Sequence, residues 1–296
     1  MAVPEIAVLV PSLGSQARAE SLRRALASIL SQEQVGARPI VVFNGPQIDQ
    51  HLLDEIRRLP DVRVSVLQDA NLPAALHEAR RLVESDWLAA LDDDDELLPG
   101  ALARRVAILE SRPECAAVVS NGIRRGPQGD ELHLQPDARI EDAPMQAMLV
   151  KNWMLPGCWL CRSDALPESV FARMPCYLEN TYLALALAGS ARIAFDLDEP
   201  TLIHNLDTPD STSASGEYRL GQEAGLRRIL ELDLPPDVRR EYERRLGEAC
   251  SSAAAVYVQR GELSAAWRLM LRSLAYPRRR HAVRTVAILA RATLRP

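Results

Sequence analysis

The sequence is poor in aromatic residues and in cysteine, and it contains no long apolar run. Aromatic residues make up 4% of the 296, so the core must be built mainly from Ala, Leu, Val and Ile. The five cysteines are odd in number and no secretory segment precedes them, so we expect reduced, structural cysteines rather than a disulfide framework. No apolar run reaches the roughly 20 residues that cross a bilayer, which predicts a cytoplasmic protein.

Basic residues gather at one end of a chain that is acidic as a whole. The net charge of −5 argues against a general nucleic-acid binder. From Arg260 onward there are nine arginines and one acid, so this stretch carries +8 and the rest about −13. On a helical wheel, four arginines fall within about 60° of one another and apolar residues lie opposite: Arg280, Arg284, Arg291 and Arg295 against Ala282, Val286, Leu289 and Ala290. This basic amphipathic helix either contacts an anionic membrane or packs on the preceding helices.

Hydrophobic periodicity in the first 120 residues alternates between the strand and the helix period. It predicts strands at 6–10, 40–43, 62–67, 87–91 and 116–120, with helices at 18–30, 52–59, 73–83 and 101–109. This alternation predicts an α/β fold with a parallel sheet, whose ligands bind beyond the carboxyl ends of the strands. Polar residues that follow three of these strands are therefore expected to converge on one cleft: Pro11-Ser12, Asn44-Gly45 and Asp92 to Glu96.

The pattern is looser after residue 120. Residues 121–142 are expected to form a hairpin or loop, and 205–216 a mobile polar loop. Between them we predict helices at 145–150 and 180–188 and strands at 159–161, 192–195 and 201–204. The remainder is predicted to be helical, with a hairpin of helices that turns at Gly261.

The acidic run Asp92 to Glu96 is the sharpest feature of the sequence. Five adjacent carboxylates repel one another, and a hard divalent cation with oxygen ligands would relieve that repulsion. Such a cation can also neutralise a diphosphate leaving group. The alternative is a solvated acidic turn that caps the helix starting near Pro99.

Residues 91–97 (LDDDDEL) resemble the D-x-D region of glycosyltransferase family 2. Four more segments resemble that family in its order: 6–11 (IAVLVP), 41–45 (VVFNG), 178–189 (LENTYLALALAG) and 201–213 (TLIHNLDTPDSTS). The resemblance implies a GT-A fold, which is a Rossmann-like, mostly parallel sheet. The fold would occupy residues 1–215, with a nucleotide-sugar half at 1–120, an acceptor half at 121–215, and a helical C-terminal region at 216–296.

The resemblance also implies an activity. A family member of this kind is an inverting hexosyltransferase that depends on Mn²⁺ or Mg²⁺. It moves a sugar from a nucleoside diphosphate to a hydroxyl acceptor, for example in polysaccharide or glycoconjugate assembly. The acceptor is unknown. A lipid-linked acceptor, together with the basic tail, would place the protein peripherally at the inner face of the membrane.

Carried over to this sequence, the resemblance assigns a role to individual residues. Asp94 and Asp92 match the metal-binding pair, and His204 matches a histidine that completes the metal shell in some members. By itself, a lone histidine at a strand end is as readily a structural residue as a metal ligand. The donor would be bound by residues of the strand ends and the acidic run: Pro11, Ser12, Asn44, Asp69, Asp92 and Asp93.

Three positions depart from the family pattern. Phe43-Asn44 replaces an aspartate pair, and Ala75-Leu76-His77 replaces A-R-N, which removes an arginine expected near the diphosphate. Glu179-Asn180 replaces the acceptor-side E-D, whose aspartate is usually the general base. Because an amide cannot accept the proton, Glu179 or another carboxylate must serve as the base.

Two other functions and one other site remain open. A nucleotidyltransferase would share the fold, although Pro11 to Ser15 matches its Gly-rich loop poorly. A non-catalytic nucleotide-sugar binding protein is made plausible by Asn180. Trp153 and Trp159 could form a wall for a sugar ring or belong to the core.

Overall fold

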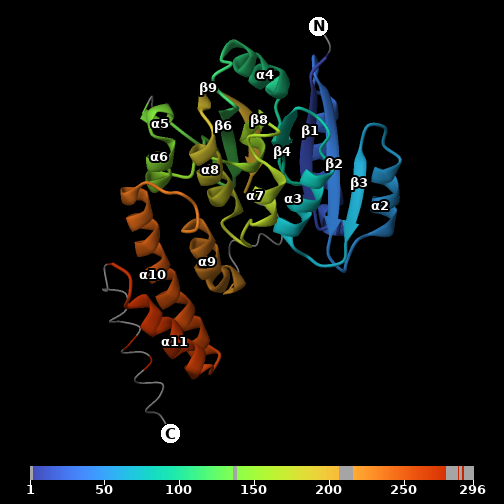
Figure 1. Ribbon diagram of the computed structural model, residues 1–296. Helices are drawn as coiled ribbons and strands as arrows, with labels where there is room; N and C mark the ends of the chain where they lie inside the picture. The colour runs from blue at the N-terminus through green and yellow to red at the C-terminus, as the bar shows by residue number, and fades with distance from the viewer. Residues whose placement is uncertain (1–2, 136–138, 207–215, 278–285, 287–288, 290–296) are drawn as a thin grey trace. The chain divides into compact units, whose positions relative to one another are not determined.

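The structure is a computed structural model that describes residues 3–135, 139–206, 216–277, 286 and 289 (Figure 1). The chain forms two compact units. The first comprises Met1–Met174 and Ala186–Pro209, and the second comprises Pro175–Leu185 and Asp210–Pro296. Residues 175–185, which include Glu179, therefore cluster with the C-terminal helices, whereas the sequence places them in the acceptor half of the transferase domain.

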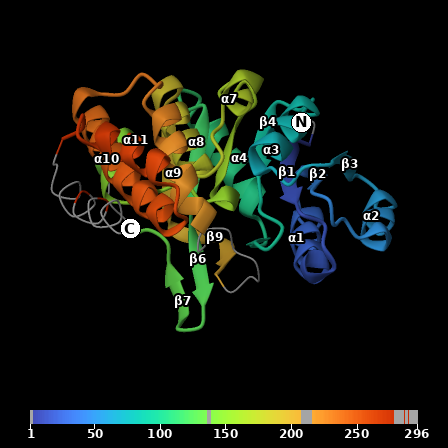
Figure 2. The same ribbon diagram turned by 90° about the horizontal axis from the view of Figure 1, so that it is seen from below.

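The first half of the first unit is a parallel sheet, as the alternation of periods predicts. Its strands lie in the order β3-β2-β1-β4, with all neighbours parallel. The strands are β1 (Glu5–Ser12), β2 (Gly36–Asn44), β3 (Arg63–Leu67) and β4 (Trp87–Ala90), and the helices between them are α1 (Ala19–Leu30), α2 (Gln50–Arg57) and α3 (Leu72–Arg81). The chain moves outward from β1 to β3 and then returns to β4, so right-handed crossovers place α1 and α3 on opposite faces (Figure 2). The order of connection reverses between β1 and β4, which is where such sheets bind ligands.

The second half of this sheet is mixed. Strand β8 (Trp159–Arg162) runs antiparallel to both β4 and β6 (Ala117–Gly126). The predicted hairpin is present, formed by β6 and β7 (Gly129–Leu132) (Figure 2). The two strands predicted at 192–195 and 201–204 are wrong as separate elements, because β9 (Ile193–Asn205) is one strand parallel to β6. Its register with β6 shifts between Ser120 and Gly122, where Asn121 pairs with Pro200, and this irregularity accommodates the proline within the strand.

Local caps fix the loops that follow β2 and β3. The Asp49 side chain accepts a hydrogen bond from the Leu52 amide at 2.9 Å and begins α2. The Asn71 side chain accepts one from the Ala74 amide at 3.0 Å, with Pro73 in the first turn of α3. The chain therefore turns sharply at the carboxyl end of the sheet.

A buried arginine ties α4 (Ala101–Ser111) to the second half of the sheet. Arg105 is fully buried and donates to Ser120 Oγ at 2.9 Å and to Thr201 Oγ1 at 2.6 Å. It also donates to the Gly157 carbonyl at 2.7 Å, in the 3-10 turn η2 (Pro156–Cys158). Buried charge is tolerated only with such hydrogen bonding.

Both tryptophans whose role the sequence left open belong to the core. Trp153 and Trp159 have no exposed surface, and Trp153 packs edge-to-face on Phe195 with ring centroids 5.3 Å apart. Neither forms a wall for a sugar ring. Short helices complete this unit: α5 (Arg139–Asp142), α6 (Pro144–Val150) and α7 (Glu168–Ala172).

The second unit is helical, as predicted. It contains α9 (Gly216–Ile229), α10 (Pro236–Gln259) and α11 (Leu263–Ser273), together with the start of α8 (Glu179–Ser190). The hairpin of α10 and α11 turns at Gly261, whose φ of +77° favours glycine. None of the described helices is long and apolar enough to cross a membrane.

In the basic tail after Pro277, the structure describes only Val286 and Leu289. Leu289 is buried with Ala254, Ala266 and Met270 of α10 and α11, as expected if the apolar side of the tail packs on these helices. Val286 is exposed. The four arginines of the predicted stripe lie outside the described residues, and so does most of the predicted loop at 205–216.

Candidate donor and metal site

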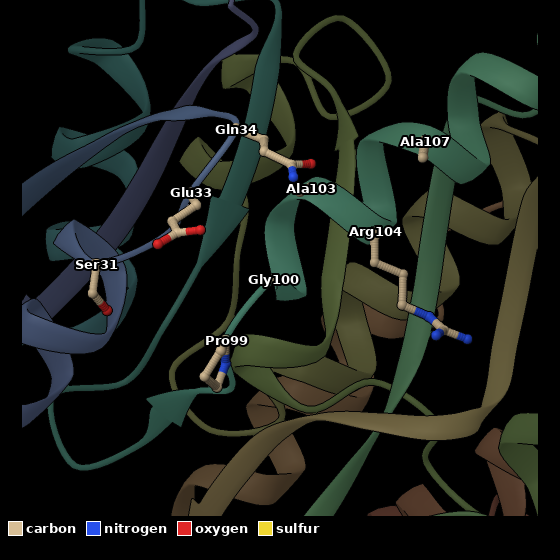
Figure 3. A pocket seen from close by; sticks show the side chains of 8 residues that line it. All are labelled: Ser31, Glu33, Gln34, Pro99, Gly100, Ala103, Arg104 and Ala107. Atoms are coloured by element: carbon tan, nitrogen blue, oxygen red, sulfur yellow. The ribbon is translucent and has the colours of Figure 1, made fainter.

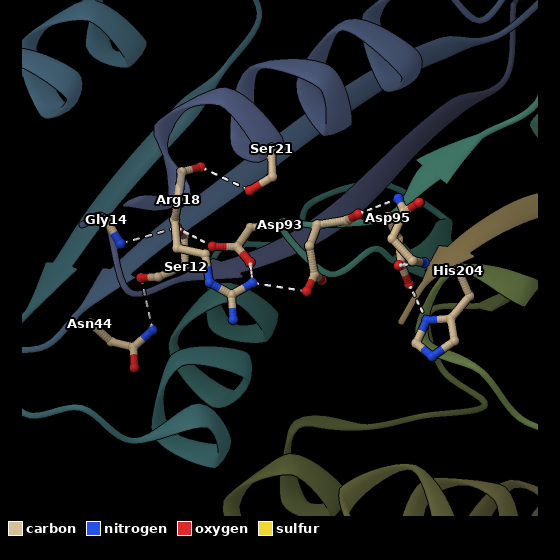
Figure 4. A network of polar contacts seen from close by, with 10 residues as sticks. Ser12, Gly14, Arg18, Ser21, Asn44, Asp93, Asp95 and His204 are labelled. Carbon is tan, nitrogen blue, oxygen red and sulfur yellow. Dashed lines mark hydrogen bonds and ion pairs between the residues drawn. The ribbon is translucent and has the colours of Figure 1, made fainter. Parts of the chain in front are cut away.

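The carboxyl ends of β1, β2 and β4 converge as the sequence predicts. Ser12 Oγ donates to Asp93 Oδ2 at 2.5 Å, and Asn44 Nδ2 donates to the Ser12 carbonyl at 3.0 Å (Figure 4). The Gly14 amide donates to Ser12 Oγ at 3.1 Å and closes the loop after β1. Three segments far apart in the sequence are thus joined at the carboxyl ends of these strands.

The acidic run forms a compact group of oxygen ligands. Carboxylate oxygens of Asp92, Asp94 and Asp95 lie within 4.8 Å of one another, and this is the one such triplet in the described part of the chain. The turn that gathers them follows β4 and is closed by the Asp95 amide, which donates to the Asp92 carbonyl at 3.2 Å. Three carboxylates at this spacing match the ligands that Mg²⁺ and Mn²⁺ prefer.

The alternative of an acidic helix cap is wrong. Helix α4 begins at Ala101, after Gly100 in the left-handed conformation, and its first turn contains no acidic residue. The aspartates precede it and are separated from it by the short strand β5 (Glu96–Leu97), which pairs with β9. The carboxylates are therefore held at the sheet edge, where the dipole of α4 does not compensate them.

Asp95 is fully buried and holds His204, the last residue but one of β9. Asp95 Oδ2 contacts His204 Nδ1 at 2.8 Å, and Asp95 Oδ1 accepts from the Asn205 amide at 2.9 Å. Because a carboxylate is the acceptor, the proton lies on Nδ1, and Nε2 is the ring nitrogen left for a ligand. Burial works to lower the pKa of His204, but the hydrogen bond and charge of Asp95 and the charge of Asp94 raise it overall. Its hydrogen bond to Asp95 links His204 to the triplet, and its role as a metal ligand remains a prediction.

Arg18 is a member of this site that the sequence analysis missed. It ends the 3-10 turn η1 (Gln16–Arg18), and its Nη1 donates to Asp93 Oδ1 at 3.1 Å and to Asp94 Oδ2 at 2.8 Å (Figure 4). In the sequence it reads as one more arginine at the start of an amphipathic helix. The available signal was its place as the first basic residue after the strand predicted at 6–10.

Arg18 compensates the negative charge of the acidic run only in part. Burial raises the pKa of Asp93 to about 6, although Arg18 and Ser12 act in the opposite direction. The charges of Asp94 and Asp95 contribute to the same rise. One guanidinium thus compensates the carboxylates only in part, and a divalent ion would stabilise their ionised forms.

The remaining donor residues occupy different settings. Asn44 is buried and its amide is engaged at both ends, because Oδ1 accepts from the Asn71 amide at 3.0 Å. Asn44 braces the loops after β1 and β3, and its contact with the base of the nucleotide stays a prediction. Asp69 is exposed in the loop after β3, while Pro11 is buried within β1. Where the family pattern has an arginine, Leu76 is buried.

A hollow of about 410 Å³ lies elsewhere on this unit (Figure 3). Its lining comes from the end of α1, the segment before β2 and the first turns of α4: Ser31, Glu33, Gln34, Pro99, Gly100, Ala103, Arg104 and Ala107. None of the predicted donor residues takes part. Arg104, its only cationic side chain, is paired with Asp196 at 2.5 Å, so we do not assign the donor to this hollow.

Glu179, the predicted base, begins α8 in the second unit. Its Oε1 accepts a hydrogen bond from the Tyr177 amide at 2.8 Å. Burial raises its pKa above the ordinary glutamate value. A raised pKa suits a general base, since it brings the carboxylate nearer to the working pH.

A mostly parallel sheet with an acidic triplet at its reversal point defines a nucleotide-diphospho-sugar transferase fold of the GT-A class. Residues 7–166 match the model of glycosyl transferase family 2, and the chain belongs to that family. An uncharacterized glycosyltransferase from Haemophilus influenzae is 28% identical over 96 residues, which cover 31% of this chain and 36% of that relative. The match thus spans only about a third of the relative's length.

Solved structures with the same fold include TarS 1-349 of S. aureus. In its complex with UDP-GlcNAc the TM-score is 0.62 at 14% identity, over 98% of this chain and 87% of that one. In its complex with UDP the TM-score is 0.56 at 15% identity, over 83% and 71%. At these identities the likeness shows the shared GT-A fold.

Proposed function

We propose that this protein transfers a sugar from a nucleoside diphosphate donor to a hydroxyl acceptor, with inversion at the anomeric carbon and with the help of Mn²⁺ or Mg²⁺. The observation that carries the proposal is the triplet of Asp92, Asp94 and Asp95 beside Ser12 at the reversal point of the sheet. Family membership favours sugar transfer over the transfer of a nucleotidyl group.

On the donor side, this chain supplies a charged and braced cradle. Asp94 and Asp92 would hold the cation, which when bound neutralises the charge that develops on the departing diphosphate. Asp95 holds the His204 ring through Nδ1, so that Nε2 would be the nitrogen available to the cation. Ser12 and Asn44 keep the loops after β1 and β3 in place, so that the nucleotide meets a preformed surface.

On the acceptor side, Glu179 removes the hydroxyl proton. The acceptor oxygen then attacks the anomeric carbon as the bond to the diphosphate oxygen breaks, and the proton ends on the Glu179 carboxylate. A single displacement of this kind inverts the configuration. The non-catalytic alternative, which Asn180 favours, differs in one respect, because such a protein would bind donor and metal without turnover.

The donor proposed first is a UDP-sugar, because TarS, which shares the fold, is solved with UDP and UDP-GlcNAc. Thermal unfolding with UDP-, GDP-, TDP- and CMP-sugars, with and without Mn²⁺, tests this directly. A ligand that binds only the folded state raises the unfolding temperature by mass action. We expect a rise with UDP-sugars that needs Mn²⁺. If no nucleotide sugar changes the unfolding temperature, the proposed function is wrong.

Removing the Arg18 charge should tighten metal binding in the absence of donor. Arg18 occupies Asp94 Oδ2, an oxygen that the cation would use. In Arg18→Met this competition is lost, and we expect the Mn²⁺ dissociation constant to fall about tenfold, which is roughly 1.4 kcal/mol. Calorimetric titration of the nucleotide-free protein measures it, with Arg23→Met on an exposed face of α1 as the control. Equal or weaker Mn²⁺ binding in Arg18→Met would show that the guanidinium does not compete for the site.

We propose further that the protein works in the cytoplasm, on a lipid-linked acceptor, and meets the membrane through its basic tail. The support is the stripe of arginines in the sequence from 280 to 295. Sedimentation with anionic vesicles at low salt should capture the full chain but not a chain that ends at Tyr276. Equal capture of both chains would leave the tail without this role.

A further inference from the structure

The two residues immediately before Glu179 have an unusual backbone. Tyr177 and Leu178 have φ values of +65° and +66°. This left-handed region disfavours residues with a Cβ, at a cost of about 1–2 kcal/mol each. Such a pair persists only where neighbouring groups hold it, and nothing in the local sequence, which has no glycine here, favours it.

The neighbouring groups belong to α9. The Tyr177 ring lies against Gly221 so closely that a Cβ on this glycine would be 1.9 Å from Tyr177 Cδ2. A Cβ on Gly225 would be 2.9 Å from the Tyr177 carbonyl oxygen. Gly221 and Gly225, which we call the glycine notch, are one helical turn apart and share one face of α9. Tyr218, on the preceding turn, packs edge-to-face on the Tyr177 ring, with the two ring centroids 5.5 Å apart.

The residue seated in the glycine notch also holds the predicted base. The Tyr177 amide donates to Glu179 Oε1 at 2.8 Å. The backbone of Glu179 itself also hydrogen-bonds this carboxylate, so its direction depends on the backbone at both Tyr177 and Glu179. The backbone at Tyr177 is in turn set by the ring and carbonyl against Gly221 and Gly225. A chain of direct contacts therefore leads from α9 to the carboxylate.

We propose that the glycine notch of α9 positions the general base, with Tyr177 as the positioning residue seated in it. The inference rests on the proposed function in taking Glu179 as the base. It gives the two glycines of α9 a specific purpose, which is to seat the residue that holds the Glu179 carboxylate. A methyl group at Gly221 must move the Tyr177 ring, and the Glu179 carboxylate would turn with it.

The test is Gly221→Ala. We expect kcat to fall between about tenfold and a hundredfold, because a displacement of about 1 Å at a reacting group can cost that much. Donor affinity and donor KM should stay within about twofold, since Glu179 acts only in the chemical step. The acid limb of the kcat–pH profile should also shift to higher pH. The hydrogen bond from the Tyr177 amide lowers the pKa of Glu179, and Glu179 would lose this hydrogen bond.

Two further variants separate positioning from general loss of stability. Gly247→Ala, on α10 of the same unit, would place a Cβ 2.9 Å from Tyr276 Cβ and does not touch residues 177–179. We expect it to keep the wild-type kcat at temperatures where it is folded. Tyr177→Ala should lower kcat by itself, and adding Gly221→Ala to it should cost no more, since the ring that clashes is gone.

The outcomes distinguish a failure of the glycine notch from a failure of Glu179 as the general base. If Glu179→Gln is inactive while Gly221→Ala and Tyr177→Ala keep the wild-type kcat and pH profile, the glycine notch has no positioning role although the proposed base stands. If Glu179→Gln is fully active, the base lies elsewhere and the inference falls with it. Should Gly221→Ala fail to fold, Tyr177→Ala alone decides, and a wild-type kcat there overturns the inference.

Discussion

Asp94→Asn should abolish the metal dependence of donor binding and reduce sugar transfer by about 10³-fold or more. The Asp94 carboxylate belongs to the triplet of oxygen ligands, and it contacts Arg18 at 2.8 Å. Bridging a diphosphate through a cation is worth several kcal/mol in the transition state, and about 4 kcal/mol corresponds to this loss of rate. An amide of the same shape keeps the packing but removes the charge that holds the ion.

Calorimetry with UDP in Mn²⁺ and in excess chelator measures the effect on binding. Wild type should lose affinity in chelator, whereas Asp94→Asn should bind weakly in both. Asp54→Asn removes the same charge from an exposed position of α2 and should behave as wild type. Equal UDP affinity in all four combinations of wild type, Asp94→Asn, Mn²⁺ and chelator would exclude a metal role for Asp94.

Glu179→Gln should remove transfer while leaving donor binding within about twofold of wild type. A positioned general base contributes roughly 10²–10⁴ to the rate, and a glutamine amide cannot accept the proton. Initial rates with a suitable acceptor give kcat, and calorimetry gives the donor affinity. Glu110→Gln, exposed on α4, is the matched control. Full turnover in Glu179→Gln would place the base on another carboxylate.

The pH dependence of kcat in the wild-type protein also tests Glu179 as the general base. The base works in its ionised form, and burial raises the pKa of Glu179, so kcat should fall on acidification through a pKa above the ordinary glutamate value of about 4.3. Asn180→Asp is informative beside it, because it restores the family's usual carboxylate. A strong rise in kcat in that variant would mean that Asn180 limits the natural protein.

Much of the donor half could be predicted from the sequence, because its signals are local. Runs of apolar residues at period 2 and period 3.6 locate β1 to β4 and α1 to α4 to within a few residues. The convergence of Ser12, Asn44 and the acidic run follows from the rule that parallel strands end at the same edge. The resemblance to the family added the expected roles, and the family itself is confirmed over residues 7–166.

The tertiary structure decided what depends on contacts between distant segments. The antiparallel direction of β8 and the union of two predicted strands into β9 are set by pairing partners, on which a strand's own sequence is silent. The contact of Arg18 with Asp94 spans 76 positions, and that of His204 with Asp95 spans 109. Hydrophobic periodicity says which face of an element is buried, but it carries no information on which side chain of another element will meet it. For the same reason the sequence could mark Glu179 as a candidate base, whereas only the folded chain reveals that Tyr177 is seated on Gly221 and holds that carboxylate.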